Sequence, residues 1–174
     1  MGLNSSLSEL FSRKPRARLG GPRRKLATKR RLLIESLEGR RVLAAFTPGN
    51  LAIYRVGNGV ETLANTGNTV FIDEYTPAGS FVQSIQLPNS GANSLVANGT
   101  STSEGGLTLS ADGNFLLLTG YGPTAIPAAS SLQATASTAV SRVVGRIDGS
   151  GTIDTSTRLT DFASGSAPRS GAST

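Results

Sequence analysis

The stretch EGGLTLSADGNFLLLTGY, Glu104–Tyr121, carries the strongest fold signal in this sequence. Two apolar runs, Leu107–Leu109 and Phe115–Leu118, flank the turn-forming centre Ser110–Asn114. In that centre an Asp side chain can bond the nearby backbone, and Gly113 accepts a positive φ without steric cost. The pattern predicts a tight β-hairpin, with the other strands arranged around it.

Strand-like segments lie on both sides of this hairpin. Leu51–Val56 alternates in the manner of a half-buried strand. Val70–Tyr75 and Ser80–Leu87 flank Thr76–Gly79, a turn with Pro second and Gly fourth, as type I turns favour. We therefore expect an all-β fold of antiparallel hairpins. The remaining expected elements are two strands, the turn between them and two polar loops: Ala139–Ile147, Thr152–Leu159, Asp148–Gly151, Asn89–Ser103 and Gly122–Thr138.

Basic residues are concentrated at the N-terminus. Residues 1–45 hold 12 of the 17 Lys and Arg residues and 3 of the 11 Asp and Glu residues, a net charge of +9. Residues 46–174 carry −3, so the high isoelectric point describes a tail and not the folded region. Residues 1–29 combine basic residues, Ser, Pro and Gly with few apolar side chains, which predicts a disordered basic tail.

Residues 30–45, RRLLIESLEGRRVLAA, have a different pattern. Leu33 and Leu37 are four residues apart, and Ile34 extends the same side of a helix. Gly39 weakens such a helix by about 1 kcal/mol relative to Ala. We expect a short amphipathic helix that needs a partner surface or receptor to persist.

The same segment has the order of an export signal, with basic residues, a short apolar stretch and then Ala44-Ala45. An ordinary signal peptide has an uninterrupted apolar core of about 7–15 residues. Here Glu35, Glu38 and Arg40-Arg41 interrupt it. The segment is therefore either an unusual sorting signal or a solvated basic tail.

Residues 34–44, IESLEGRRVLA, resemble the Leu-Glu-x-Leu-Glu-x-Arg-x-x-Leu extension of LEPR-XLL type, which opens many large exported proteins of planctomycete-type bacteria. Ile34 stands where the first Leu is usual, and Gly39 where Pro, Asp or Asn is usual. The resemblance implies contact with export or sorting machinery through residues 30–45. It also implies a secreted or cell-surface location in a bacterium.

A second resemblance concerns the β-region. Leu109–Asn114 is similar to the Ser-x-Asp-Gly turn of WD40-like and lactonase-like propellers, and Asn50–Tyr121 resembles the opening of propeller-like surface ectodomains. The resemblance implies one to two propeller blades in residues 46–174. A closed propeller typically has about four to eight blades. We therefore expect an incomplete, N-terminal fragment of a propeller-like domain, with a sandwich or open sheet as the alternative.

The sequence lacks residue types that many catalytic sites use. His and Cys are absent, which excludes a Ser-His-Asp triad, thiol nucleophiles and His or Cys zinc ligands. Every Lys lies within residues 1–29, so the folded region has no Ser-Lys dyad or Schiff-base lysine. We expect no catalytic, cofactor-binding or metal-binding residues, no cofactor and no enzymatic activity. The apolar runs are also far shorter than the roughly 18 residues of a membrane span.

Oxygen-bearing side chains are the remaining candidates for chemistry. Asp73 and Glu74 are adjacent, so in a strand they point to opposite faces, and we interpret them as a solvated hairpin end. Oxygens alternate along a second segment in the manner of a calcium loop, but Ile153 and Leu159 stand where an EF-hand has Gly and Glu, which favours a plain turn. That segment contains Asp148, Ser150, Thr152 and Asp154.

Glu104 and the segment Asn98-Gly99-Thr100 are two further candidate features. Glu104 precedes Gly105-Gly106, and we interpret it as a polar strand entry, with a position facing a propeller channel as the alternative. Asn98-Gly99-Thr100 fits the glycosylation sequon, which we interpret as a chance match.

Three functions compete. The first is an exported or cell-surface bacterial protein with a non-catalytic binding or scaffolding β-domain for an unidentified ligand or surface partner. The second is the N-terminal part of a lactonase-like propeller hydrolase. The third is a small β-domain with a nucleic-acid-binding basic tail, motivated by the +9 segment. No aromatic residues alternate with its basic residues, which argues against nucleic acid.

Overall fold

The computed structural model of this chain describes residues 46–173. The predictions of a disordered tail over residues 1–29 and a short helix over residues 30–45 lie outside the described residues. The described part consists of β-strands, turns and one short 3₁₀ helix, which confirms the all-β prediction. Within it, no helix combines the length and apolar character that crossing a membrane requires.

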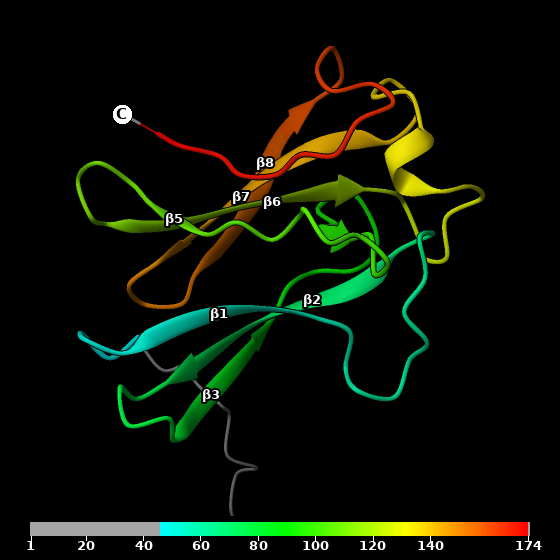
Figure 1. Cartoon of the computed structure of the whole chain (residues 1–174). Helices are drawn as coiled ribbons and strands as arrows, with labels where there is room; N and C mark the ends of the chain where they lie inside the picture. Colours follow the sequence, from blue (N-terminus) through cyan, green and yellow to red (C-terminus); the bar gives the residue numbers. More distant parts are fainter. Residues whose placement is uncertain (1–45, 174) are drawn as a thin grey trace, which may run out of the picture. The chain divides into compact units, whose positions relative to one another are not determined.

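All strand pairs of the described part are antiparallel. Consecutive strands are neighbours within two groups, β1-β2-β3 and β5-β6-β7-β8, and the short β4 joins the start of β2 to β6. Figure 1 shows these two groups as two layers. The strands are β1 (Leu51–Val56), β2 (Asn68–Tyr75), β3 (Phe81–Gln86), β4 (Val96–Ala97), β5 (Thr108–Leu109), β6 (Phe115–Gly122), β7 (Ser141–Asp148) and β8 (Ile153–Leu159), and the helix η1 is Leu132–Ala134.

The hairpin predicted around Gly113 is present as β5 and β6. The Ser110 N–H donates to the Phe115 carbonyl over 2.8 Å, and the Gly113 N–H donates to the Ser110 carbonyl. Gly113 has a φ of 73°, and the Asp112 carboxylate accepts bonds from the Ser110 hydroxyl and the Asn114 N–H. Local side-chain bonds of this kind fix the turn and with it the register of the two strands.

The other two predicted turns are also confirmed. Between β2 and β3, the Gly79 N–H donates to the Thr76 carbonyl over 2.9 Å. Between β7 and β8, the Gly151 N–H donates to the Asp148 carbonyl over 2.9 Å.

The main core lies between the two layers. Alternate residues of a strand point to one face, and most inward positions of β1, β2, β6 and β7 are apolar. Full burial of such side chains stabilises the fold by about 1.5–3 kcal/mol each. The buried members of this cluster are Val70, Ile72, Leu87, Leu95, Ala97, Leu118, Val143 and Ile147.

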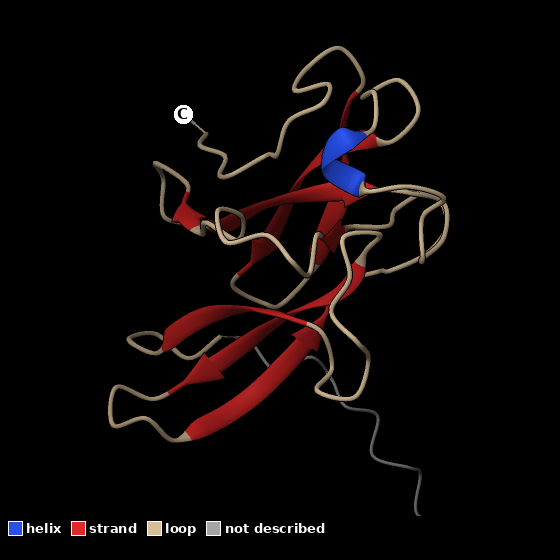
Figure 2. Ribbon diagram, turned by 45° about the vertical axis from the view of Figure 1, so that its right-hand side comes forward, coloured by secondary structure: helices blue, strands red, loops and turns tan. Residues whose placement is uncertain are grey.

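The chain itself covers the outer face of the β5-β6-β7-β8 sheet. Tyr121 and Val96 pack there against Leu132 of η1. The Thr119 hydroxyl donates to the Pro168 carbonyl over 3.0 Å, and the Gly106 N–H donates to the Arg169 carbonyl over 3.1 Å. Figure 2 shows the covering coil on this side of the strands.

The outer face of the β1-β2-β3 sheet exposes large apolar side chains to solvent. Leu51 and Ile53 of β1 are 54% and 46% exposed, and Phe81 of β3 is 58% exposed. The Tyr75 and Phe81 rings meet edge to face, with centroids 5.5 Å apart. This sheet therefore carries apolar side chains on both faces.

The structure corrects three sequence-based boundaries. The predicted loop Asn89–Ser103 contains β4, and the predicted loop Gly122–Thr138 contains η1. Residues 162–174 are rich in Ser, Ala and Gly, which predicts an end without regular structure, but Pro168 and Arg169 of this segment accept hydrogen bonds from Thr119 and Gly106. Each of these segments is held by contacts with residues distant in sequence, which local composition does not report.

Candidate ligand pocket

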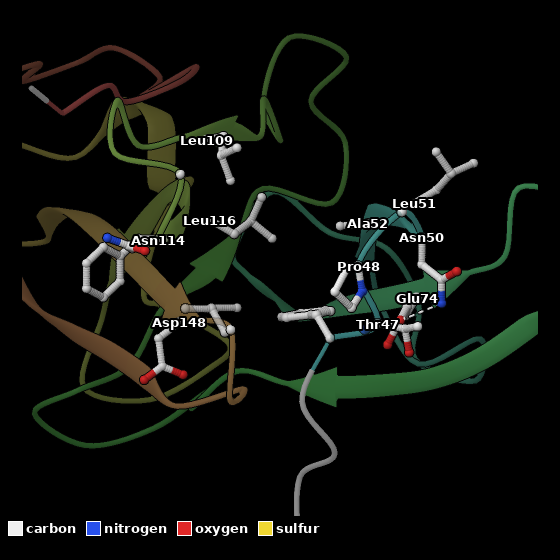
Figure 3. Close-up of a pocket in the computed structure, with 16 residues that line it drawn as sticks. Thr47, Pro48, Asn50, Leu51, Ala52, Glu74, Leu109, Asn114, Leu116 and Asp148 are labelled. Atoms are coloured by element: carbon white, nitrogen blue, oxygen red, sulfur yellow. Dashed lines mark hydrogen bonds between the residues drawn. The ribbon is translucent and has the colours of Figure 1, made fainter.

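A pocket of about 410 Å³ opens where β1 begins and where the β5–β6 and β7–β8 hairpins turn. Small-ligand sites typically have volumes of about 300–1,000 Å³. Figure 3 shows Leu109 and Leu116 between a polar group around Glu74 and a second polar group at Asn114 and Asp148. Most of the wall is apolar, with side chains from Phe46, Pro48, Leu51, Ala52, Leu109, Phe115, Leu116 and Ile147.

Glu74 is the buried carboxylate of the pocket, at 1% exposure. Its Oε1 accepts the Thr47 N–H over 2.8 Å and the Asn50 Nδ2–H over 2.6 Å. Its Oε2 accepts the Gln83 Nε2–H over 2.5 Å. The carboxylate thus fastens the segment before β1 to β2 and β3.

These bonds determine the protonation state of Glu74. Burial alone raises the pKa of a carboxyl group, because it penalises the charged form. The bonds from Gln83, Thr47 and Asn50 outweigh burial and hold the pKa of Glu74 below its ordinary value. Glu74 is therefore ionised at neutral pH, and its known donors already occupy both oxygens.

On the opposite side of the pocket, the polar groups are also hydrogen-bonded within the protein. The Asp148 Oδ1 accepts the Ser150 N–H, the Ser150 hydroxyl and the Thr152 N–H, all within its own turn. These bonds, the Ser150 hydroxyl first, lower the pKa of Asp148. The Asn114 amide donates to the Asp112 Oδ2 over 2.7 Å. Because these polar groups serve local bonds, the pocket offers mainly apolar contact to a ligand.

Asp73 lies on the other face of β2, as the alternation predicts. Its carboxylate accepts the Arg55 Nε–H over 2.5 Å and the Ser84 hydroxyl over 2.5 Å. Burial alone would raise the pKa of Asp73. The bonds from Arg55 and Ser84 lower this pKa by more than burial raises it, so it lies below its ordinary value. The interpretation of Asp73 and Glu74 as a solvated hairpin end is wrong, because their exposures are only 5% and 1%.

Glu104 is half-buried and accepts hydrogen bonds from two buried residues. It accepts the Tyr121 hydroxyl over 2.8 Å and the Asn98 N–H over 3.2 Å. Burial, followed by the bond to Glu104, raises the pKa of Tyr121, and burial with the Glu104 charge raises that of Tyr54. Both phenols are therefore neutral hydrogen-bond donors at physiological pH, and Glu104 anchors the segment before β5.

The calcium-like segment is a turn with an adjoining ion pair. Asp148 closes the turn, while Asp154 binds Arg146 at 2.9 Å and accepts the Ser156 N–H. Asp148 and Asp154 thus serve separate local bonds. Among residues 46–173, no three or more His, Cys, Asp or Glu side chains gather in a way that would hold a metal ion.

The sequon residue Asn98 is 5% exposed. Its Oδ1 accepts both the N–H and the hydroxyl of Thr100. The side chain that a glycan would modify is therefore enclosed in its own turn.

Of the residues singled out from the sequence, the structure brings Glu74 and Asp148 to one pocket and leaves Asp73, Asn98 and Glu104 elsewhere. The pocket segment Phe46–Asn50 was not predicted from the sequence. One signal was present, because Glu74 has the same parity in β2 as the apolar Val70 and Ile72 and so points inward with them.

The match to a known protein family lies on the N-terminal side of residue 46. A model of the Planctomycete extracellular family matches residues 28–45. The chain thus has a planctomycete-type N-terminal extension, at the place where the sequence resembles an export signal. This extension indicates an exported or surface protein with an extracellular location. Comparison with curated proteins and with solved structures gave no significant match.

Proposed function

We propose that this chain is an exported bacterial protein whose β-domain binds a small, largely apolar ligand and performs no catalysis. The family match over residues 28–45 supports export. The observation that carries the binding role is the pocket of about 410 Å³, whose wall is mainly apolar and whose carboxylates are already hydrogen-bonded. The lack of His and Cys in the sequence supports a non-catalytic role.

Export is tested by fusing residues 1–45 to a reporter enzyme in a planctomycete host. We expect reporter activity outside the cytoplasm. A fusion that lacks residues 28–45 is the matched control, because it removes the segment that the family model matches and keeps most of the basic tail. Equal retention of both fusions in the cytoplasm would refute export through this segment.

Binding is tested with N-phenyl-1-naphthylamine, a neutral apolar fluorescent probe. We expect fluorescence enhancement with the purified protein, and weaker binding by about tenfold or more in Leu109→Arg, since Leu109 lines the pocket and is 65% exposed. Val60→Arg is the control, because Val60 is 90% exposed and is not part of the pocket wall. Equal affinity of both variants would contradict binding in this pocket.

We propose in addition that the extension is of LEPR-XLL type. We also propose that β1-β2-β3 and β5-β6-β7-β8 are successive blades of a propeller-like ectodomain. Two observations support the blades: each group connects consecutive strands, and β1-β2-β3 carries apolar side chains on both faces. Propeller blades are four-stranded sheets that repeat around a channel. A crystal structure of the full gene product tests this. A β1-β2-β3 outer face open to solvent there would contradict it.

A further inference from the structure

We infer that the unpaired edge of β1 binds an extended peptide segment of a partner protein, and that one apolar side chain of this peptide enters the pocket. This inference rests on the proposed function, because it specifies the apolar ligand of that pocket as a peptide side chain. Among residues 46–173, β1 pairs with β2 alone, so its other edge carries unpaired backbone groups. Such an edge is a ready site for the addition of a further strand.

The register of β1 and β2 shows which backbone groups face this edge. In an antiparallel pair, hydrogen-bonded residue pairs alternate with pairs that are not hydrogen-bonded. The bond of 2.7 Å from the Gly57 N–H to the Thr69 carbonyl fixes the phase of this alternation. Every second residue of β1 therefore directs its N–H and C=O groups away from β2. These residues are Ala52, Tyr54 and Val56.

β1 also lacks the features that protect sheet edges from pairing. Lys, Pro and inward-pointing charges are common protections, and β1 contains neither Lys nor Pro. Its single charged residue, Arg55, is engaged in an ion pair with β2. Leu51 and Ile53 are exposed beside the edge. The opposite edge strand of the sheet, β8, carries Asp154 and Arg158 instead, so β1 is the better site for a further strand.

The pocket lies at the same edge. Ala52 lines it together with Leu109 and Leu116 of the β5–β6 hairpin (Figure 3). Residues opposite one another on neighbouring strands point to the same face of a sheet. A peptide residue opposite Ala52 therefore directs its side chain to the face that holds the pocket. Backbone bonds to β1 then supply affinity, and the side chain in the pocket supplies specificity.

The surroundings of the edge favour a single peptide strand over a second copy of the chain. If two copies paired through antiparallel β1 strands, the two-fold axis would be perpendicular to the sheet, and both β5-β6-β7-β8 sheets would lie on the same face. The hairpins of one copy already flank the pocket on that face. The pocket oxygens of Glu74 and Asp148 accept bonds from the chain itself, and most of the wall is apolar. We therefore expect a peptide with alternating apolar residues and no charge at the pocket.

The test uses the end-capped peptide Lys-Thr-Val-Thr-Val-Thr-Leu-Thr-Lys with the purified full chain. In antiparallel pairing its Leu lies opposite Ala52 when its two Val residues lie opposite Tyr54 and Val56. We expect amide hydrogen exchange, resolved by NMR, to slow by about tenfold or more at these three residues of β1. The N–H groups of Ile53 and Arg55 already bond to β2 and serve as the internal reference.

The control peptide has the same side chains, with N-methyl groups on its two Val residues and its Leu. It keeps the apolar contacts and lacks the N–H groups that would pair with β1. We expect no slowing of exchange at Ala52, Tyr54 and Val56. Equal effects of the two peptides would contradict backbone pairing and refute the inference.

A variant of the chain tests the edge separately from the pocket. Val56→Pro removes an edge-facing N–H at a residue that does not line the pocket, so we expect affinity for the peptide to fall by about tenfold or more. Val56 packs against the core, and Val56→Ala is the matched control because it loses the same packing and keeps the N–H. Binding of N-phenyl-1-naphthylamine to both variants shows that the fold and pocket are intact. If Val56→Pro does not fold, the N-methylated peptide decides.

The outcomes separate this inference from the proposed function. If the naphthylamine probe binds but the peptide does not slow exchange at the edge of β1, the inference is refuted and the pocket keeps its proposed role. If neither binds, both are refuted. Exchange at the edge that slows with rising protein concentration, without peptide, identifies a second copy as the occupant and refutes a partner peptide. Slowing by the parent peptide alone supports the inference.

Discussion

The guanidinium carbon of Arg142 lies 5.0 Å from the centroid of the Tyr121 ring, and both side chains are completely buried. The Arg142 N–H groups donate to the carbonyls of Thr135 at 2.8 Å and Ala163 at 3.1 Å, which belong to the two coil segments that cover the sheet. Burial lowers the pKa of Arg142, but a guanidinium remains charged at neutral pH. One side chain of β7 thus holds both covering segments.

Replacing Arg142 with Met tests this role. The substitution removes the guanidinium donors from several carbonyl groups of the covering segments, so we expect the free energy of unfolding to fall by about 3 kcal/mol. Hydrogen exchange should increase in residues 133–140 and 160–167. The control is Arg146→Met, because the Arg146 side chain is 54% exposed and its ion pair with Asp154 contributes at most about 1 kcal/mol. Equal losses in both variants would contradict the anchoring role.

The ion pair between Arg55 and Asp73 gives a second prediction. Asp73 is buried, but the Arg55 side chain is 37% exposed and packs on the Phe71 ring, so solvent screens the pair. A double-mutant cycle with Arg55→Met and Asp73→Asn should give a coupling energy of about 1 kcal/mol, measured by urea unfolding. If the effects of the two substitutions are additive, the ion pair contributes no coupling energy. Arg55 and Asp73 would then stabilise the fold separately, through the Phe71 ring and the Ser84 hydroxyl.

The turns of this fold were predictable because their chemistry is local. The β5–β6 hairpin depends on Asp112 and Gly113, which bond within the turn, and the sequence shows both directly. The short strand β4 was not predictable in the same way. It has two residues, and its pairing depends on Thr69 and Tyr121, far away in the sequence.

The pocket was less predictable than the fold. Acidic residues are usually exposed, so Asp73 and Glu74 appeared to be a solvated hairpin end. Their burial depends on donors from distant segments, including Asn50 and Gln83 for Glu74. The parity of Glu74 with Val70 and Ile72 indicates its direction, but not the donors that meet it.

A glycine substitution tests the close contact between β4 and β6. A Cβ on Gly120 would lie 2.6 Å from the Val96 carbonyl oxygen and 2.7 Å from the Leu95 Cδ2. We expect Gly120→Ala to lower the free energy of unfolding by about 1–3 kcal/mol, because the backbone of β4 must move. In Gly149→Ala the new Cβ meets no heavy atom within 4 Å, so the change should stay within about 0.5 kcal/mol. Thermal unfolding of both variants tests this prediction. Equal stabilities of Gly120→Ala and Gly149→Ala would contradict a close contact between β4 and β6.

The fold should lose stability in acid through Glu74 and Asp73. Burial raises the pKa values of Glu74 and Asp73, but hydrogen bonds outweigh it, so both folded-state values lie below the unfolded ones of about 4. The unfolded state therefore binds more protons in acid, and the stabilisation by these groups is present above pH 4 and is lost as the pH falls through the folded values. The free energy of unfolding should decrease steadily below about pH 4.

Glu74→Gln isolates the contribution of the pocket carboxylate to this acid response. The amide keeps the size of the side chain and an oxygen that can accept from Thr47 and Asn50, so the loss at neutral pH should be about 1 kcal/mol. The variant has no charge to neutralise at position 74, so its stability should fall less steeply below pH 4 than that of the parent. Glu74→Ala, which leaves the donors unpaired, should lose about 2–3 kcal/mol at neutral pH. Parallel acid profiles for the parent and Glu74→Gln, measured by urea unfolding from pH 2 to 7, would mean that Glu74 does not titrate below its ordinary range.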